Sequence, residues 1–361
     1  ASYIRTIRNI TTKGIDKKAR TKGQHLARDG MVHAQFLITG TRSGRLSSRD
    51  PNLQQLPARG QVKRIYTSRF GDKGCLYQGD LSQIELRLIA AACGDEAMVD
   101  AYVRGIDLHS LTMSRIFKMP YEHCIKDHVS ALQKAGKDKE AKECELKRKI
   151  SKTINFLTGY GGGAQGLQAT LAQDGIYQTI EECEAFLEAF FDSYPALREY
   201  LSYYKGFIES NGVAVSMLGR VRIFEEAGSD DKGLKSKALR AGCNHLIQAT
   251  ASDMMLCCIC AIETLMRDAG LKSILISTVH DSLLVDCVRE ELPIVHEIAM
   301  SVFTNIPDIL ETWIGDDVDL SWTRMLPFDG DSEVGKNYLD MVKLSHDNND
   351  WADVFKRMDE E

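Results

Sequence analysis

Two apolar runs joined by a short polar turn constrain the fold of this chain more than any other feature. Residues 274–279 and 283–288 have the length and the β-branched and aliphatic content of strands, and the sequence HDS lies between them. This pair predicts an antiparallel hairpin with Asp281 in its turn. A further apolar run at residues 75–80 predicts another strand, which ends at Asp80. Both aspartates are therefore expected where a strand gives way to a polar segment.

Ordinary structural roles would explain each aspartate taken alone. Ser82 and Glu85 have the spacing of a capping box, which predicts that a helix starts here and runs through Ala92. Asp80 could then be a helix cap, and Asp281 a standard turn residue. A catalytic role for either carboxylate depends on the other motifs of the chain.

A helical stretch between the two aspartates carries cations on one face. Arg148, Lys152, Phe156 and Tyr160 are four residues apart, and four residues turn an α-helix by about 400°, a drift of only about 40° per step. The pattern predicts a helix over residues 144–156 with these side chains on a common face. Several glycines then interrupt it, as a hinge or a plain loop. The alternative interpretation is a solvated basic helix face.

Length and composition predict a globular protein. With 361 residues, 43% of them hydrophobic, the chain can bury a sizeable core as two domains or as one domain with a large subdomain. No stretch approaches the roughly 18 uninterrupted apolar residues of a membrane span. The polar N-terminus lacks the apolar core of a signal peptide. We therefore expect a cytoplasmic protein with no membrane partner.

Charge is distributed unevenly along the chain, whose formal net charge is -6. Residues 1–70 contain 15 Lys and Arg against 3 Asp, whereas residues 290–361 contain 5 against 18 acidic residues. A basic segment of this kind would neutralise backbone phosphates of a nucleic acid. The alternative is a basic surface that binds nothing in particular.

The ten cysteines are predicted to be reduced thiols, because they are scattered through a large chain without a secretion signal. Cys257 and Cys260 have a Cys-x-x-Cys spacing but lie in an apolar, helix-like run. No second ligand pair is near them in sequence, so zinc is not expected there.

Four segments, in order, resemble those of family A DNA polymerases, the DNA polymerase I group. Residues 79–87 (GDLSQIELR), 147–156 (KRKISKTINF) and 278–282 (TVHDS) are similar to motifs A, B and C of that family. Residues 41–57 (TRSGRLSSRDPNLQQLP) are similar to the segment that grips the primer-template. The resemblance extends from about Thr41 to the sequence VGKNY near residue 338.

The resemblance implies an α+β fold of the right-hand polymerase type. A palm with an antiparallel sheet would comprise residues 41–107 and 241–361, and helical fingers would comprise residues 108–240. Residues 1–40 would be a basic N-terminal segment with the end of a thumb. The thumb would be largely absent, and no exonuclease domain is expected in this chain. A natural short polymerase, a fragment and one half of a split enzyme, with a separate chain carrying thumb and exonuclease, remain open.

The implied activity is DNA-templated DNA synthesis by a two-metal-ion mechanism. A primer 3'-hydroxyl would receive dNMP from dNTP with release of pyrophosphate, in replication or repair. Asp80, Asp281 and the main-chain carbonyl of Leu81 would hold two Mg²⁺ ions, with Mn²⁺ as an alternative. Lys152 is the candidate general acid for the departing pyrophosphate.

The family resemblance also assigns the substrate contacts. Arg148, Lys152 and His109 would contact the triphosphate of the dNTP, Phe156 would stack near its sugar and base, and Tyr160 would lie toward the template. Glu85 corresponds to the steric gate that excludes a 2'-hydroxyl. The residues expected to contact primer or template in the minor groove are Arg45, Arg240, Asn244, Gln248 and His280. Each could instead be a polar residue with a local partner.

Some positions depart from the commonest family pattern. Leu157 stands where Gly usually follows Phe, and Ser282 stands where cellular members often have an acidic residue. A third carboxylate at the metals is therefore in doubt, and the Ser variant favours a phage origin, hence the host cytoplasm. Residues 127–147 form a charged, helix-prone insert of unassigned function.

Two competing functions remain. One is a single-subunit RNA polymerase or a reverse transcriptase, and Glu85 argues against the RNA polymerase. The other is a catalytically idle DNA-binding subunit whose partner supplies activity or stability.

Overall fold

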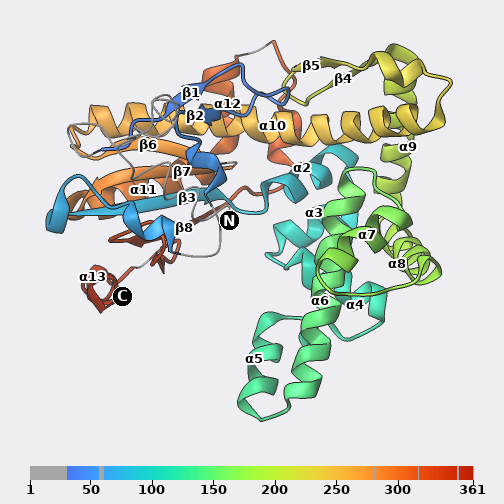
Figure 1. Cartoon of the computed structure of the whole chain (residues 1–361), viewed down its shortest axis with the longest axis horizontal. Helices are drawn as coiled ribbons and strands as arrows, with labels where there is room; N and C mark the ends of the chain where they lie inside the picture. The colour runs from blue at the N-terminus through green and yellow to red at the C-terminus, as the bar shows by residue number, and fades with distance from the viewer. Residues whose placement is uncertain (1–30, 57–60, 280, 316, 348, 361) are drawn as a thin grey trace, which may run out of the picture. The chain divides into compact units, whose positions relative to one another are not determined.

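The chain divides into two compact units in the computed structural model, which describes residues 31–56, 61–279, 281–315, 317–347 and 349–360 (Figure 1). Unit 1 comprises residues 1–82, 251–317 and 328–361, and unit 2 comprises residues 83–250 and 318–327. The mixture of helices with an antiparallel sheet confirms the α+β class.

Unit 1 is built on a five-stranded antiparallel sheet in the order β6-β7-β3-β8-β9. Its strands are β3 (Gly74–Leu81), β6 (Ile274–Val279), β7 (Ser282–Val288), β8 (Gly330–Gly335) and β9 (Val342–Lys343). The predicted hairpin is thus present as β6 and β7, and the predicted strand at residues 75–80 is the central strand β3. A separate two-stranded ribbon pairs β1 (Gln35–Leu37) with β2 (Ser47–Arg49).

One face of the main sheet is closed by helix α11 (Leu292–Thr304). A Cβ on Gly79 of β3 would lie 3.0 Å from the ring of Phe303 in this helix, and a Cβ on Gly330 of β8 would lie 2.5 Å from the same ring. Tyr77 is fully buried. Because successive residues of a strand point to opposite faces, Asp80 points away from α11.

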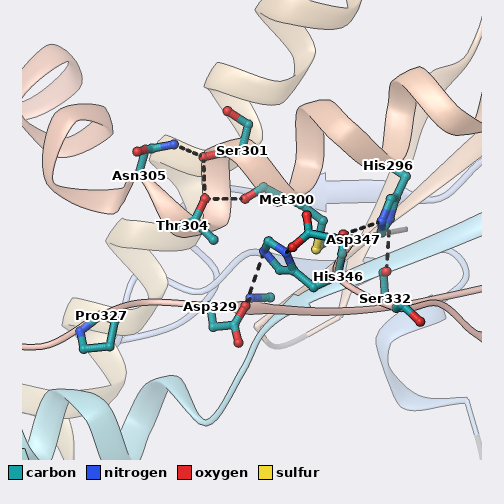
Figure 2. Close-up of polar contacts among 12 residues, drawn as sticks. His296, Met300, Ser301, Thr304, Asn305, Pro327, Asp329, Ser332, His346 and Asp347 are labelled. Carbon is teal, nitrogen blue, oxygen red and sulfur yellow. Dashed lines mark hydrogen bonds and ion pairs between the residues drawn. The ribbon is translucent and has the colours of Figure 1, made fainter. Parts of the chain in front are cut away.

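His296 of α11 links the helix to the sheet (Figure 2). Its Nδ1 atom lies 3.3 Å from the Ser332 hydroxyl and 3.5 Å from the Tyr77 hydroxyl, and its Nε2 atom lies 3.1 Å from the His346 carbonyl. Burial lowers the pKa of His296, so this ring is held as a neutral hydrogen-bonding group. The closed face is therefore a packed core, and the opposite face carries the polar chemistry.

Two further helices complete unit 1, α12 (Ile306–Ile314) and α13 (Trp351–Glu360). Arg289 follows β7 and makes two hydrogen bonds to Asp359 of α13, at 2.8 and 3.0 Å. These contacts attach the end of the described chain to the end of a core strand.

Unit 2 is mostly helical. Its helices are α2 (Ile84–Cys93), α3 (Glu96–Val103), α4 (Leu108–Phe117), α5 (Lys126–Lys134), α6 (Asp138–Gly159), α7 (Ala164–Gln173), α8 (Ile180–Ser193) and α9 (Pro195–Asn211). A small hairpin pairs β4 (Val213–Val215) with β5 (Val221–Ile223). The predicted helix at residues 144–156 lies within α6.

The charged insert at residues 127–147 forms α5 and the first half of α6. These two segments lie side by side in Figure 1. Leu132 of α5 belongs to one buried cluster with Ala141 and Cys144 of α6 and Met113 of α4. The insert is thus packed onto the unit through a small apolar core.

The capping box predicted for Ser82 and Glu85 is wrong. The N-cap of α2 is Gln83, which has left-handed backbone angles (φ 51°, ψ 32°) and no side-chain capping bond. The main-chain N–H of Ser82 instead donates to the carbonyl of Asp329 at 2.9 Å. The carboxylate of Glu85 accepts a hydrogen bond from the Tyr160 hydroxyl. Tertiary partners thus replace the local cap.

Helix α10 (Lys232–Asp268) is the longest of the described helices. By length and composition it could cross a membrane, since an 18-residue window has a mean hydropathy of 1.4. However, 78% of that window is buried inside the protein, which is typical of a core helix. The ten cysteines are all free thiols.

Candidate active site

Asp80 and Asp281 lie on neighbouring backbone segments of unit 1. Asp80 is close to the end of β3, where it pairs with Ser282, the first residue of β7. The main-chain N–H of Leu81 donates to the carbonyl of Asp281 at 3.3 Å. The turn between β6 and β7 therefore brings Asp281 next to the end of β3. His280, in the same turn, lies outside the described residues.

A further carboxylate, Asp331, lies on the other side of β3 and was missed in the sequence. Strand β8 pairs Asp331 directly with Asp80. Directly opposed residues share a sheet face, with Cβ atoms about 4.5–5.5 Å apart. Glu333 follows on the same face. Two acids spaced by two residues just before VGKNY are a usable signal in the sequence, but they do not reveal how this segment aligns with β3.

These carboxylates make the end of β3 strongly negative. Burial, followed by the charges of Asp331, Glu333 and Asp281, raises the pKa of Asp80 to about 6. Such a carboxyl ionises more readily once a cation is present. The electrostatics of this face thus favour binding of a positive group.

A positive group already meets Asp281. The Nη2 atom of Arg45 lies 2.9 and 3.1 Å from the two carboxylate oxygens of Asp281, and the two side chains are only 18% and 19% exposed. Arg45 was predicted from the resemblance to contact DNA. In this structure its guanidinium stands where a cation would bind the carboxylate.

The donor set fits a hard divalent cation. Asp80 and Asp281 supply carboxylate oxygens, which Mg²⁺ prefers, and a guanidinium already neutralises one of them. No three His, Cys, Asp or Glu side chains converge as a preformed metal cage within the described residues. Mg²⁺ is usually held by one or two protein carboxylates together with substrate phosphates and water, and Asp80 and Asp281 would supply such carboxylates.

In unit 2, Arg148 is held by a network at the start of α4. Its Nη2 atom donates to Asp107 at 2.6 Å, and its Nη1 atom donates to the Ser110 hydroxyl at 2.5 Å. Burial alone would raise the pKa of Asp107, but hydrogen bonds from Ser110 and Arg148 outweigh it, so this pKa is lowered. Asp107 is therefore an anion that orients Arg148.

The other predicted triphosphate contacts surround Phe156. The ammonium group of Lys152 lies 6.0 Å from the centroid of the Phe156 ring, and the ring of His109 lies 5.7 Å from it. Burial lowers the pKa of His109 to about 4, and the nearby cations Arg148 and Lys152 also lower it. Two permanent cations and one neutral imidazole are thus grouped here.

Glu85 of α2 and Tyr160, the residue that follows α6, are joined by the hydrogen bond described above. The predicted gate residue Glu85 and the predicted template-side residue Tyr160 are therefore in direct contact. Arg240, Asn244 and Gln248 recur every four residues along α10. The side-chain oxygen of Asn244 is buried without a hydrogen-bond partner in the described part of the chain.

Comparisons with known proteins agree with this picture. The sequence profile described as DNA polymerase family A matches residues 4–337. A DNA polymerase of Bacillus phage SP01 is 30% identical over 329 residues, which is 88% of this chain and 33% of that protein. The thermostable DNA polymerase I of Thermus aquaticus is 31% identical over 80% of this chain and 33% of that protein. The chain thus spans about a third of the length of these curated relatives.

A solved structure is also similar. The POL domain of Pol1 from M. smegmatis, in complex with a DNA primer-template and dNTP, superposes with a TM-score of 0.70 at 26% identity. The match covers 87% of this chain and 49% of that one. Together with the sequence profile, these similarities confirm the resemblance seen in the motifs, and the chain belongs to DNA polymerase family A.

Proposed function

We propose that this chain carries out DNA-templated DNA synthesis, adding dNMP from dNTP to a primer 3'-hydroxyl and releasing pyrophosphate. The observation that carries the proposal is the pairing of Asp80 with the first residue of β7, next to the turn that holds Asp281. Family membership supports it, as does the primer-template and dNTP bound to the similar M. smegmatis domain.

Asp80, Asp281 and the carbonyl of Leu81 would hold two Mg²⁺ ions, with Mn²⁺ as an alternative. When bound, such ions stabilise the attacking and leaving oxygens of phosphoryl transfer. Arg45 would exchange its carboxylate partner for DNA. Raising the pH above the pKa of Asp80, about 6, would keep this carboxylate ionised for its role.

The side chains of unit 2 would bind the nucleotide. Arg148 and Lys152 would neutralise the triphosphate as fixed cations, with His109 as a neutral donor, and Lys152 would protonate the departing pyrophosphate. Phe156 would stack near the sugar and base. Glu85, held by the Tyr160 hydroxyl, would occupy the space that a 2'-hydroxyl needs, which selects dNTP.

The remaining contacts would fall on the primer-template. Arg240, Asn244, Gln248 and His280 would reach its minor groove. In this proposal residues 41–107 and 241–361 would form the palm, whose sheet lies in unit 1, and residues 108–240, which lie in unit 2, would form the fingers. The protein would act in the cytoplasm, and a separate chain with a thumb or exonuclease is a candidate partner.

Primer extension with carboxylate variants tests the proposal. Asp80→Asn and Asp281→Asn should each lower the rate at least about 100-fold, since each removes a negatively charged ligand of the proposed Mg²⁺ ions. Asp72→Asn, an exposed acid of the same unit, should keep wild-type activity. Full extension by both active-site variants would exclude the assignment.

Separate substrate pools distinguish the competing functions. Incorporation of NTP in preference to dNTP would favour an RNA polymerase, and efficient copying of RNA templates a reverse transcriptase. Tight primer-template binding without extension, alone and with candidate partner chains, would favour an idle DNA-binding subunit.

A further inference from the structure

A chain of buried hydrogen bonds runs through unit 2 to His109. The hydroxyl groups of Tyr194 and Thr112 lie 3.1 Å apart, Thr112 Oγ1 lies 3.0 Å from Asn155 Oδ1, and Asn155 Nδ2 lies 2.9 Å from His109 Nδ1. Tyr194 and Thr112 are fully buried, and Asn155 is 2% exposed. Solvent therefore does not compete for these groups, and their donors and acceptors must match one another.

Arg115 lies at the far end of this series of hydrogen bonds, next to Tyr194. The guanidinium of Arg115 lies 4.9 Å from the centroid of the Tyr194 ring, and its Nη1 atom donates to the carbonyl of Ser193 at 2.8 Å. Burial raises the pKa of Tyr194, while Thr112 and Arg115 act against that rise. Thr112 has one hydroxyl proton and donates it to the carbonyl oxygen of Asn155, so at the contact with Tyr194 the Thr112 oxygen accepts and the phenol donates.

Each later step then has one direction. Thr112 accepts from Tyr194 and donates its proton to the carbonyl oxygen of Asn155. The amide group of Asn155 must therefore present its NH₂ to His109. Because an NH₂ group donates, Nδ1 of His109 accepts, and the ring proton of the neutral imidazole lies on Nε2.

We propose that Asn155 is a positioning residue that selects the Nε2–H tautomer of His109 and thereby makes His109 a hydrogen-bond donor toward the triphosphate of the incoming nucleotide. The triphosphate contact rests on the proposed function, whereas the tautomer assignment does not. Nε2 makes no hydrogen bond within the described residues, and it is not one of their buried polar atoms without a partner. It is thus the ring atom left for a ligand.

The tautomer matters because phosphate oxygens only accept hydrogen bonds. With its proton on Nδ1, the ring would present a lone pair to those oxygens and weaken nucleotide binding. The low pKa of His109 excludes the alternative of a doubly protonated ring near neutral pH. A neutral ring in the correct tautomer can donate without adding a third positive charge next to Arg148 and Lys152.

Nitrogen-15 NMR of the full chain labelled at histidine reads the tautomer directly. The His109 signals are assigned by their loss in His109→Gln, and the wild-type ring should show a protonated Nε2 and an unprotonated Nδ1. In Asn155→Asp, a carboxylate that only accepts should move the proton to Nδ1 or protonate both nitrogens. Thr112→Val removes the donor that orients the amide, and should give a mixture of tautomers.

Nucleotide binding supplies the second readout. Thr112→Val should raise KM for dNTP about tenfold, the effect of one lost hydrogen bond, with a smaller change in kcat. Ser151→Ala, a buried hydroxyl of α6 outside the chain of bonds, should change neither the NMR pattern nor KM.

An Nδ1–H ring in the wild-type protein would overturn the inference without need of any variant. A wild-type NMR pattern in both folded variants, verified by circular dichroism, would overturn the role of Asn155. An unchanged KM in a variant with altered tautomers would overturn the triphosphate contact. A wild-type chain that extends no primer, yet shows the expected NMR pattern, would contradict the proposed function and support the tautomer assignment.

Discussion

Burial keeps the ring of His109 uncharged at a pH where histidine in water is half protonated. The ordinary value of 6.5 falls to about 4, because the ring is only 7% exposed and lies near two cations. A polar side chain that binds phosphate without carrying charge avoids repulsion from Arg148 and Lys152. As a result, the folding stability of the protein depends on pH.

That dependence has a defined sign. Between pH 6.5 and about 4 the unfolded chain binds a proton at His109 and the folded chain does not, so stability is present above pH 6.5 and is lost as the pH falls. The full effect is about 3 kcal/mol. Urea unfolding from pH 7 to 4.5 should show a shallower decline in His109→Gln than in the wild type. His123→Gln, at an exposed histidine, should retain the wild-type decline; equal slopes in all three proteins would refute this account.

At the residue scale, the sequence identified side chains but not their partners. His109 and Arg148 were assigned by family resemblance, and the structure adds Asp107 and Asn155 as the groups that hold them. Asn155 is visible in the sequence next to Phe156, yet its role depends on contacts that no local pattern contains.

At the scale of elements, the position of β3 between β7 and β8 determines the environment of Asp80. Ser282 lies opposite Asp80 on one side and Asp331 on the other. Asp80 thus has a hydroxyl group opposite it on β7 and a carboxylate opposite it on β8.

Separate substitutions at Asp331 and Ser282, the two residues opposite Asp80, should shift the pKa of Asp80 in opposite directions. Burial is the largest cause of its rise to about 6, and Asp331 is the next. Asp331→Asn should lower this pKa, and Ser282→Asp should raise it, since a nearby like charge disfavours ionisation. Carboxyl carbon-13 NMR titration measures both, with Asp72→Asn as the control. A pKa that does not respond to Asp331→Asn would contradict the strand pairing.

Periodicity predicted β3, the β6–β7 hairpin and α6, because each carries its signal within a short stretch of sequence. It failed at the start of α2, where Gln83 takes left-handed angles and tertiary hydrogen bonds replace the expected cap. It was silent on β8, whose pattern of glycine and acids is not that of an ordinary strand. The position of Asp331 opposite Asp80 could therefore be found only from the structure.

At the scale of the whole molecule, some of the basic side chains in the first 70 residues already form ion pairs with carboxylates of the protein, and others do not. In the described part of this segment, Arg64 is bound to Asp340 at 2.7 Å and Arg69 to Asp286 at 3.5 Å. The exposed side chain of Arg42 makes no such ion pair with described residues. Net charge along the sequence thus overstates the charge available to DNA.

Salt dependence of primer-template binding should separate the two kinds of cation. Arg42→Ala should reduce the slope of log affinity against log salt by about 0.9, the value for one phosphate contact. Arg64→Ala should leave the slope unchanged, because its guanidinium is already held by two hydrogen bonds to Asp340. Fluorescence anisotropy from 50 to 200 mM salt, about the range over which such contacts weaken, measures the slopes. A loss of slope in Arg64→Ala alone would reverse the assignment.

The position of the Phe303 ring limits how strands β3 and β8 can align with each other. It fits against β3 and β8 only where both strands lack a side chain, at Gly79 and Gly330. A slip of either strand by one position would turn Asp80 or Asp331 under the aromatic ring. The packing of Phe303 therefore favours the strand register that keeps Asp80 and Asp331 together on the face opposite α11.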